Sequence, residues 1–259
     1  MTLAIDIGNT NVVIGLSEGE QWPHVWRFPT LSSAEEAQLF YPTHLGDHLL
    51  EAGVGSDDIK QVIISSVVPI LIAPFVELIQ QFLEKEPIVL GRKVYEKLPL
   101  SIENKDEIGA DLVANAMAAH RLYQRDIIVV DFGTALTFTT LNAKGALLGV
   151  AIAPGLKTAM SVLHHKTAQL PEVPLGLPDS ALGRNTVHAI QSGVLIGYVG
   201  LVRNLLASIR AEVGPQYIAI ATGGLSTILY PLRDDFFAVD PHLTLHGLRL
   251  IGECINRDG

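Results

Sequence analysis

Two stretches of the chain repeat one pattern, and this repeat constrains the fold more than any other feature. Residues 3–16, LAIDIGNTNVVIGL, and residues 128–141, IVVDFGTALTFTTL, each run from an apolar segment through an aspartate and a glycine into a second apolar segment. This pattern predicts two strands joined by a short turn, with Asp6 or Asp131 at the end of the first strand. Either turn alone is also typical of an ordinary hairpin, because Asp and Gly are common turn residues. Two copies in corresponding positions indicate instead a duplicated unit.

Strands and helices alternate around each copy. In the first half we expect a helix from Ser33 to Ala52, a buried strand in QVIISSVVP, a helix in ILIAPFVELIQQFLEKE and a short strand in PIVLG. The apolar positions of the first of these helices are Ala37, Leu39, Phe40, Leu45, Leu49 and Leu50. In the second half we expect a helix in ADLVANAMAAHRLY, a strand in LLGVAIAPGL, a loop at 171–186, a long helix at 187–213 and a strand in YIAIATGGLS. This order predicts an α/β protein with mixed sheets flanked by helices.

The composition argues against several classes of protein. With 18 basic and 27 acidic residues, the net charge of −9 repels a polyanion, which argues against nucleic acid as the main ligand. Cys254 is the single cysteine, so an internal disulfide and a cysteine pair for zinc are both excluded. We expect no unbroken apolar run of membrane-spanning length and no membrane association. These features indicate a cytoplasmic protein, whose 48% hydrophobic residues supply a core and a subunit interface.

The two predicted turns carry the residue types that a phosphoryl-transfer site needs. Glycine at Gly8 and Gly133 lets the backbone approach a phosphate closely. The polar donors beside them are Asn9, Thr10, Asn11 and Thr134. Asp6 and Asp131 end their strands, where a carboxylate can hold a hydrated cation. The chain has no G-x-x-x-x-G-K-[ST] loop and no dinucleotide fingerprint, so the commoner phosphate-binding loops are excluded.

Eight motifs occur in the same order as in one known family. They are DIGNT, SSVVP, NKDEIGAD, DFGTALTF, AIAPGL, GRNTVHAIQSG, ATGGLS and DPHLTLHGLRLI, and together they extend over nearly the whole chain. In these motifs the chain resembles the type III pantothenate kinases of coenzyme A synthesis. The resemblance implies the acetate kinase, sugar kinase, Hsp70 and actin fold, with two ribonuclease-H-like domains. The implied domains are residues 1–108, with the first turn, and residues 109–259, with the second turn and a dimer interface.

The resemblance also implies a reaction and its site. ATP would phosphorylate the primary hydroxyl of pantothenate to give 4'-phosphopantothenate, with Mg²⁺ and a monovalent cation, K⁺ or NH₄⁺, as cofactors. Asp111 corresponds to the catalytic base, Asp6 lies near magnesium, and Asp131 corresponds to the potassium ligand. The implied ATP-binding residues are Asp6, Ile7, Gly8, Asn9, Thr10, Asn11, Val12, Val13, Gly133 and Thr134. The implied pantothenate-binding residues are Gly109, Ala110, Asp111, Leu112 and Thr186. In the family that threonine comes from the second protomer, which implies a homodimer.

Several of these positions also have a purely structural interpretation. Asp111 lies in the first turn of a predicted helix, where the helix dipole favours a carboxylate whether or not it is catalytic. Thr186 precedes an apolar helical run and could serve as its N-cap. Gly223 and Gly224 could serve the nucleotide or simply form a turn. The stretch from His164 to Lys166 is expected in a solvated loop.

One departure from the family pattern concerns the pantothenate carboxylate. Many members have arginine directly after the catalytic aspartate, whereas this chain has Leu112, which cannot donate a hydrogen bond. Lys105, Arg184 and His165 are the candidate partners for that carboxylate, and a helix N-terminus could contribute as well. The departure leaves two alternative functions open. The chain could be a non-catalytic regulatory protein on the same scaffold, or a kinase or phosphohydrolase of the superfamily that acts on another small acid or alcohol.

Overall fold

The chain packs as two compact units in the computed structural model. Met1–Arg121 and Leu243–Gly259 form unit 1, and Leu122–His242 form unit 2. The structure describes residues 1–167, 169–224 and 230–257. Leu225 and Ser226 of the ATGGLS motif lie outside the described residues.

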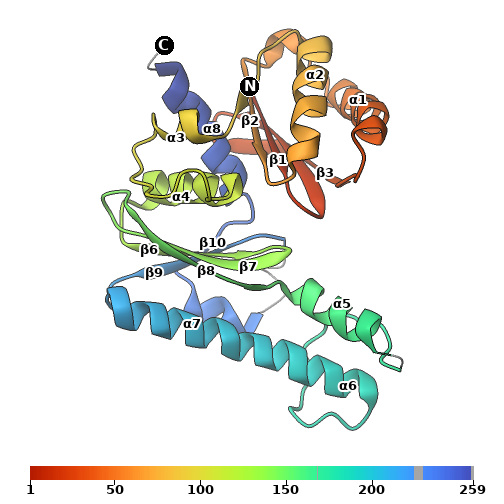
Figure 1. Cartoon of the computed structure of the whole chain (residues 1–259), viewed down its shortest axis with the longest axis vertical. Helices are drawn as coiled ribbons and strands as arrows, with labels where there is room; N and C mark the ends of the chain where they lie inside the picture. Colours follow the sequence, from red (N-terminus) through yellow and green to blue (C-terminus); the bar gives the residue numbers. More distant parts are fainter. Residues whose placement is uncertain (168, 225–229, 258–259) are drawn as a thin grey trace. The chain divides into compact units, whose positions relative to one another are not determined.

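The two units contain sheets of the same topology (Figure 1). The sheet of unit 1 has the order β3-β2-β1-β4-β5, with β1 (Thr2–Ile7), β2 (Asn11–Glu18), β3 (Gln21–Pro29), β4 (Gln61–Ser66) and β5 (Ile88–Val89). The sheet of unit 2 has the order β8-β7-β6-β9-β10, with β6 (Ile127–Phe132), β7 (Ala135–Leu141), β8 (Leu147–Pro154), β9 (Ile218–Thr222) and β10 (Ala238–Val239). In each sheet the first two pairings are antiparallel and the last two are parallel. The predicted α/β fold with two duplicated halves is therefore confirmed.

Eight α-helices of the described chain accompany these sheets. They are α1 (Ala34–Glu51), α2 (Ile72–Leu83), α3 (Arg92–Tyr95), α4 (Ala110–Tyr123), α5 (Leu156–Lys166), α6 (Thr186–Gln191), α7 (Gly197–Val213) and α8 (Leu243–Arg257). The prediction of a loop at His164 to Lys166 is wrong, because these residues form the exposed last turn of α5. An α-helix ends there with basic side chains, which its C-terminal dipole favours.

One face of the first sheet packs against α1 and α2. Side chains of β1 and β2 form a core with the buried stripe of α1, which is Ala37, Tyr41, Leu45 and Leu49. Ser33 caps α1, since its hydroxyl accepts a hydrogen bond from the Glu36 N–H at 3.2 Å. Leu39 and Leu50 were expected on the apolar stripe, but they are 79% and 81% exposed. The buried positions recur every four residues, so these two leucines point away from the sheet.

The opposite face of the first sheet packs against α8, a helix that the sequence did not predict. Gly252 of α8 lies against Ile63 of β4, and a Cβ atom at Gly247 would overlap the carbonyl of Ala114 in α4. The Thr244 hydroxyl also donates to Asn115 Oδ1 at 2.8 Å. Helix α8 therefore joins α4 to the first sheet, although it comes from the other end of the chain.

The second sheet packs against α7, which continues a longer helix. Together α6, a π-helical segment at Ser192–Ile196 and α7 form one helix, Thr186–Val213. By length and composition this helix could cross a membrane, since its most apolar window has a mean hydropathy of 1.5 and is 33% buried. The expectation that no run has spanning length is therefore not confirmed. The match is weak evidence for a membrane span, because core helices of soluble proteins also meet this test.

The domain boundary expected at residues 108 and 109 stays a prediction. The expected boundary separates the two copies of the sequence repeat, whereas the two units are defined by which segments pack together. In the packing, α4 and α8 both belong with the first sheet.

Candidate active site

The first turn, residues 8–11, is a tight hairpin between β1 and β2. The Gly8 N–H donates to the Asn11 carbonyl at 3.0 Å, and a Cβ atom at Gly8 would lie 3.1 Å from that same oxygen. Thr30, which directly follows β3, is hydrogen-bonded to this turn twice. Its hydroxyl donates to the Gly8 carbonyl at 2.6 Å, and its N–H donates to the Thr10 carbonyl at 3.1 Å. These bonds tie two carbonyls of the turn to Thr30 and so restrain its backbone.

The second turn, residues 133–135, is held in a comparable way. The Gly133 N–H donates to the Ala135 carbonyl at 3.1 Å. The Thr158 hydroxyl donates to the Thr134 carbonyl at 2.8 Å, and the Gly155 N–H donates to the same carbonyl at 3.1 Å. A side chain at Gly155 would overlap the backbone of the turn. Both turns are therefore braced by a threonine hydroxyl from another element.

Gly223 fits closely beside the Asp131 carboxylate. Its φ of +89° lies in the region that favours glycine, and a Cβ atom there would overlap Asp131 Oδ1 and the backbone of Phe132. The sequence left open whether Gly223 forms a turn or serves the nucleotide. The structure supplies a packing reason, because only glycine leaves room for the carboxylate at this strand end.

Asp111 occupies the first turn of α4 in a fixed pose. Its Oδ1 accepts a hydrogen bond from the Leu112 N–H at 2.9 Å. A Cβ atom at Gly109 would lie 2.5 Å from the same Oδ1, closer than real Cβ contacts come. Glycine is therefore required at position 109 for the carboxylate to stand where it does.

The surroundings of Asp111 weaken its acidity. Burial raises the pKa of the Asp111 carboxyl, and the backbone N–H groups of Leu112 and Asp111 offset part of that rise. Nearby Tyr95 is 4% exposed, and its burial together with the charge of Asp111 raises the pKa of Tyr95 to about 12. Tyr95 therefore stays a neutral phenol. A carboxylate with a raised pKa is a better proton acceptor at neutral pH than an exposed one.

Accessibility divides the predicted ATP-binding residues. Ile7 and Val12 are fully buried, so only their backbone could contact a ligand. Asn9, Thr10 and Thr134 are exposed at the two turns. The polar side chains of both turns therefore face solvent, whereas the flanking aliphatic side chains fill the core.

The residues predicted to bind pantothenate differ in exposure. Leu112 and Ala110 are 8% and 5% exposed, so both side chains pack inside the protein. Thr186 is exposed at the first position of α6. The suggestion that Thr186 caps this helix is wrong, because the cap is Asn185, whose side chain accepts from the His188 N–H at 2.9 Å.

The candidate partners for a carboxylate also differ in their surroundings. His165 Nδ1 is engaged by the Ser161 carbonyl at 2.9 Å, one turn earlier in α5. Arg184 is exposed in the loop before α6. Lys105 is half-buried in the loop that leads to Gly109, in the same unit as Asp111.

The predicted site residues are distributed over both units. Asp6 and Asp111 belong to unit 1, and Asp131 and Thr186 belong to unit 2. In unit 1, Asp6 of β1 pairs with Ser65 of β4, two residues beyond the pair of Ala4 and Ile63. Residues two apart in a strand point to the same face of the sheet. Asp6 therefore points to the face of Ile63, which packs against α8. Helix α4, which carries Asp111, packs against α8 on that side. Asp6 and Asp111 therefore belong to the same side of the first sheet.

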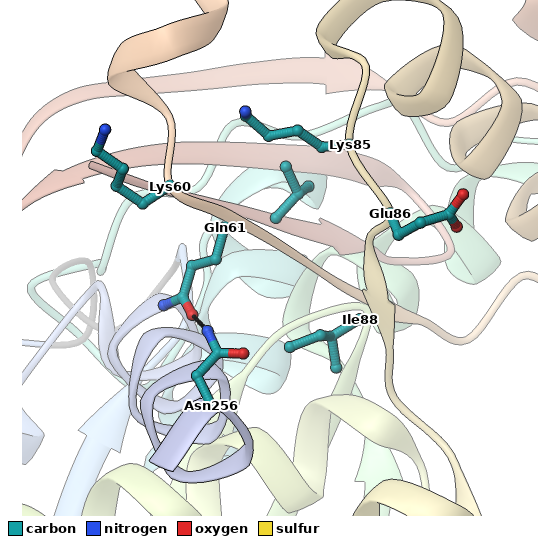
Figure 2. A pocket seen from close by; sticks show the side chains of 7 residues that line it. Lys60, Gln61, Lys85, Glu86, Ile88 and Asn256 are labelled. Carbon is teal, nitrogen blue, oxygen red and sulfur yellow. Dashed lines mark hydrogen bonds between the residues drawn. The ribbon is translucent and has the colours of Figure 1, made fainter. Parts of the chain in front are cut away.

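A pocket of about 240 Å³ opens at the other end of this sheet. It is lined by Lys60, Gln61, Val62, Lys85, Glu86, Ile88 and Asn256 (Figure 2). The Asn256 amide donates to Gln61 Oε1 at 2.6 Å, and the two lysine side chains extend along one side (Figure 2). Gln61 begins β4, whereas Asp6 lies near the carboxyl end of the parallel strand β1. The pocket is thus separate from the predicted site.

Three residues that the sequence did not reveal support this site. Thr30 and Thr158 brace the two turns, and Tyr95 lies beside Asp111. No sequence signal identifies them, because each is distant along the chain from the residue that it supports. Their positions follow only from tertiary packing.

The chain matches the family model for type III pantothenate kinase over residues 2–208. It is 42% identical to a type III pantothenate kinase of Thermomicrobium roseum over 257 residues. This alignment covers 99% of this chain and 98% of that protein. It is 43% identical to a type III pantothenate kinase of Treponema pallidum over 258 residues, and this alignment covers 98% of this chain and 94% of that protein.

Solved structures share the fold. A Campylobacter jejuni protein described as a Baf-family transcriptional activator has a TM-score of 0.62 at 18% identity, over 98% of this chain and 99% of that chain. The activator of the 2-hydroxyisocaproyl-CoA dehydratase from Clostridium difficile, with bound ADPNP, has a TM-score of 0.54 at 12% identity, over 99% and 96%. At these identities both show the fold alone, which is that of the actin-like ATPases.

Proposed function

This chain belongs to the type III pantothenate kinase family, and we propose that Asp111 and the two turns perform the family's reaction in the roles that its motifs predict. The enzyme phosphorylates pantothenate with ATP, a step of coenzyme A biosynthesis. Neither the regulatory function nor a different acid substrate has support among the relatives, which are named pantothenate kinases.

The fixed pose of the Asp111 carboxylate is the observation that carries the proposed mechanism. Asp111 accepts the proton of the primary hydroxyl of pantothenate while that oxygen forms its bond to the γ-phosphorus. The bond from the γ-phosphorus to the bridging oxygen breaks at the same time, and ADP leaves. Gly109 leaves room for the carboxylate and the Leu112 N–H binds it in that position, which favours such an in-line transfer because the acceptor oxygen must be aligned.

The two turns supply the groups that bind ATP. Their braced backbones and the exposed Asn9, Thr10 and Thr134 side chains offer N–H and O–H donors to phosphate oxygens. The carboxylates of Asp6 and Asp131 fit cations, because carboxylate oxygens are ligands of hard cations. Each lies one residue before the end of its strand, close to a glycine turn. Asp6 would hold Mg²⁺ and Asp131 the monovalent cation, K⁺ or NH₄⁺. When bound, these cations neutralise charge on the phosphates.

Lys105 is the best candidate to bind the pantothenate carboxylate in place of the family's arginine. It belongs to the unit of Asp111 and to the loop that continues into Gly109. Its ammonium group provides charge without the bidentate geometry of arginine. The side chain of Leu112 is buried and contributes only packing, whereas its backbone N–H binds the Asp111 carboxylate.

A homodimer in the cytoplasm is the proposed working form. Large apolar side chains of unit 2 are exposed, including Ile152 at 69% and Leu182 at 83%. Such surface is typical of an interface between copies. Thr186 is exposed and follows Leu182 by four residues. It would complete the pantothenate site of the second protomer.

Turnover with pantothenate tests the proposal directly. ADP formation is measured with Mg²⁺ and K⁺, with and without pantothenate, and the phosphorylated product is identified by mass. Asp111→Asn is expected to lower kcat by about 10²–10⁴-fold while ATP binding persists. Wild-type kcat in this variant would show that another group is the base.

Mixed dimers test the shared site. Asp111→Asn and Thr186→Ala protomers are each assayed alone and after mixing through denaturation and refolding. If Thr186 acts across the interface, the mixture recovers about one quarter of wild-type activity, because half of the dimers have one intact site. No recovery, with mixed dimers demonstrated by mass, would place Thr186 in its own protomer's site.

A further inference from the structure

Three strands of the second sheet bring oxygen-bearing side chains into one row at Asp131. Strand pairing sets Thr137 of β7 opposite Asp131 of β6, and Thr222 of β9 beside Asp131 on the other flank. Directly paired residues of neighbouring strands point to the same face of a sheet. The Asp131 side chain therefore lies in one row between the side chains of Thr137 and Thr222, and we call these three residues the hydroxyl row.

Both hydroxyls of this row are buried and lack a hydrogen-bond partner among the described residues. Thr222 is fully buried and Thr137 is 9% exposed, and neither Oγ1 is hydrogen-bonded. A buried hydroxyl without a partner is unfavourable, and native proteins retain few of them. Two such groups flanking one carboxylate indicate a ligand that satisfies them.

The first sheet repeats part of this arrangement. Ser65 of β4 pairs with Asp6 as Thr222 of β9 pairs with Asp131, and the Ser65 hydroxyl is also fully buried without a partner among the described residues. On the other flank Asp6 pairs with Val13, where the second sheet has Thr137. The orphan hydroxyl beside the carboxylate is thus a repeated feature, and the second unit carries one hydroxyl more.

We propose that the hydroxyls of Thr137 and Thr222 bind the monovalent cation together with the Asp131 carboxylate. This inference rests on the proposed function, which assigns the cation to Asp131 alone. One negative charge with neutral oxygen ligands matches a singly charged ion, whereas tight Ca²⁺ sites use several carboxylates and Mg²⁺ retains most of its water. The described residues contain no group of three or more His, Cys, Asp or Glu side chains that could hold a metal ion.

Valine variants remove the proposed ligands with little change of shape. Thr137→Val and Thr222→Val each replace the hydroxyl by a methyl group, and Thr222→Ser keeps the hydroxyl. Thr139→Val is the matched control. Thr139 lies two residues further along β7, is fully buried, and also has a hydroxyl without a partner among the described residues, but it pairs with Val129.

Thermal unfolding measures cation binding without turnover. Each full-length variant is melted in a KCl titration in which choline chloride keeps the ionic strength constant, because a ligand of the folded state raises the Tm with its concentration. We expect the K⁺ concentration for half of the Tm increase to rise about tenfold or more in Thr137→Val and Thr222→Val. Thr222→Ser and Thr139→Val should respond as the wild type does. In choline alone, the valine variants should melt no lower than the wild type, because they lose an unpaired buried hydroxyl.

The outcomes separate this inference from the function on which it rests. In one outcome, K⁺ raises the Tm of the wild type and of both valine variants but not that of Asp131→Asn. The inference is then wrong, and the assignment of the cation to Asp131 stands. If Thr139→Val weakens the K⁺ response as much as the other two, the hydroxyl row has no special role and the inference is also overturned. If the wild type does not respond to K⁺ at all, both the inference and the cation assignment fail, while pantothenate turnover still decides the kinase function.

Discussion

Gly109→Ala should misplace the carboxylate of Asp111, the proposed catalytic base, without removing it. The added Cβ would lie 2.5 Å from Asp111 Oδ1, whereas real Cβ contacts are essentially never shorter than 3.0 Å. The two atoms must therefore separate by about 0.5 Å, and the end of the Asp111 side chain is the part that moves most easily. Because a displacement of about 1 Å can cost about 100-fold in rate, we expect kcat to fall by about 10- to 100-fold. That fall corresponds to about 1.4–2.8 kcal/mol of lost transition-state stabilisation.

Steady-state kinetics with pantothenate and ATP measure this effect. Gly91→Ala is the control in the same unit, because a Cβ there meets no atom within 4 Å. The double variant Gly109→Ala/Asp111→Asn should be no slower than Asp111→Asn alone, since the carboxylate is then already absent. Wild-type kcat in Gly109→Ala, or an equal fall in Gly91→Ala, would refute the reasoning that Gly109 acts by positioning Asp111.

Three further predictions concern stability, the first turn and the substrate. Burial raises the pKa of Asp111 in the folded protein above its ordinary value of 3.8. The folded protein therefore keeps this proton to higher pH than the unfolded chain does. Once Asp111 is ionised in both the folded and the unfolded protein, its charge lowers the free energy of unfolding. Asp111→Asn should therefore have a higher Tm than the wild type at pH 7. Melting curves should show this difference in Tm shrink as the pH falls toward 3.8. A lower Tm of the variant at pH 7 would contradict the prediction. Thr30→Val removes the 2.6 Å bond to the Gly8 carbonyl and should cost about 1 kcal/mol of stability and raise the KM for ATP, whereas an unchanged KM would show that the turn needs no brace. Lys105→Ala should raise the KM for pantothenate about tenfold and leave that for ATP unchanged, and equal effects on both would argue against a carboxylate contact.

The sequence predicts the two hairpins because their signals are local. Alternating aliphatic runs specify the strands, and Asp-x-Gly specifies each turn within a few residues. The position of Asp111 at the start of α4 follows in the same way. Signals of this kind also recover α1, but periodicity alone does not identify the buried stripe, and Leu39 was assigned to the wrong face.

Features that depend on distant contacts were not predictable. Helix α8 contributes to the core of unit 1 although more than 100 residues separate it from the preceding part of that unit. Thr30 acts on a carbonyl 22 residues away, and nothing in its neighbourhood marks it as different from other threonines. The burial that raises the pKa of Asp111 is likewise a property of packing.

The duplication accounts for the two cation sites that we propose. Asp6 and Asp131 occupy the same place at the ends of β1 and β6, so the fold provides one carboxylate in each unit. Their neighbours differ, since Val13 stands opposite Asp6 where Thr137 stands opposite Asp131. An aliphatic neighbour offers no ligand, so a cation at Asp6 must keep more of its water, as Mg²⁺ usually does. Two hydroxyls beside Asp131 can replace water directly, which suits a larger ion that holds its hydration shell less strongly. Val13→Thr would therefore test whether the flanking residue sets this difference. When Val13→Thr is combined with Asp131→Asn, K⁺ should again raise the Tm, now through a site at Asp6. If K⁺ does not raise the Tm of this double variant, the flanking residue does not determine which ion binds.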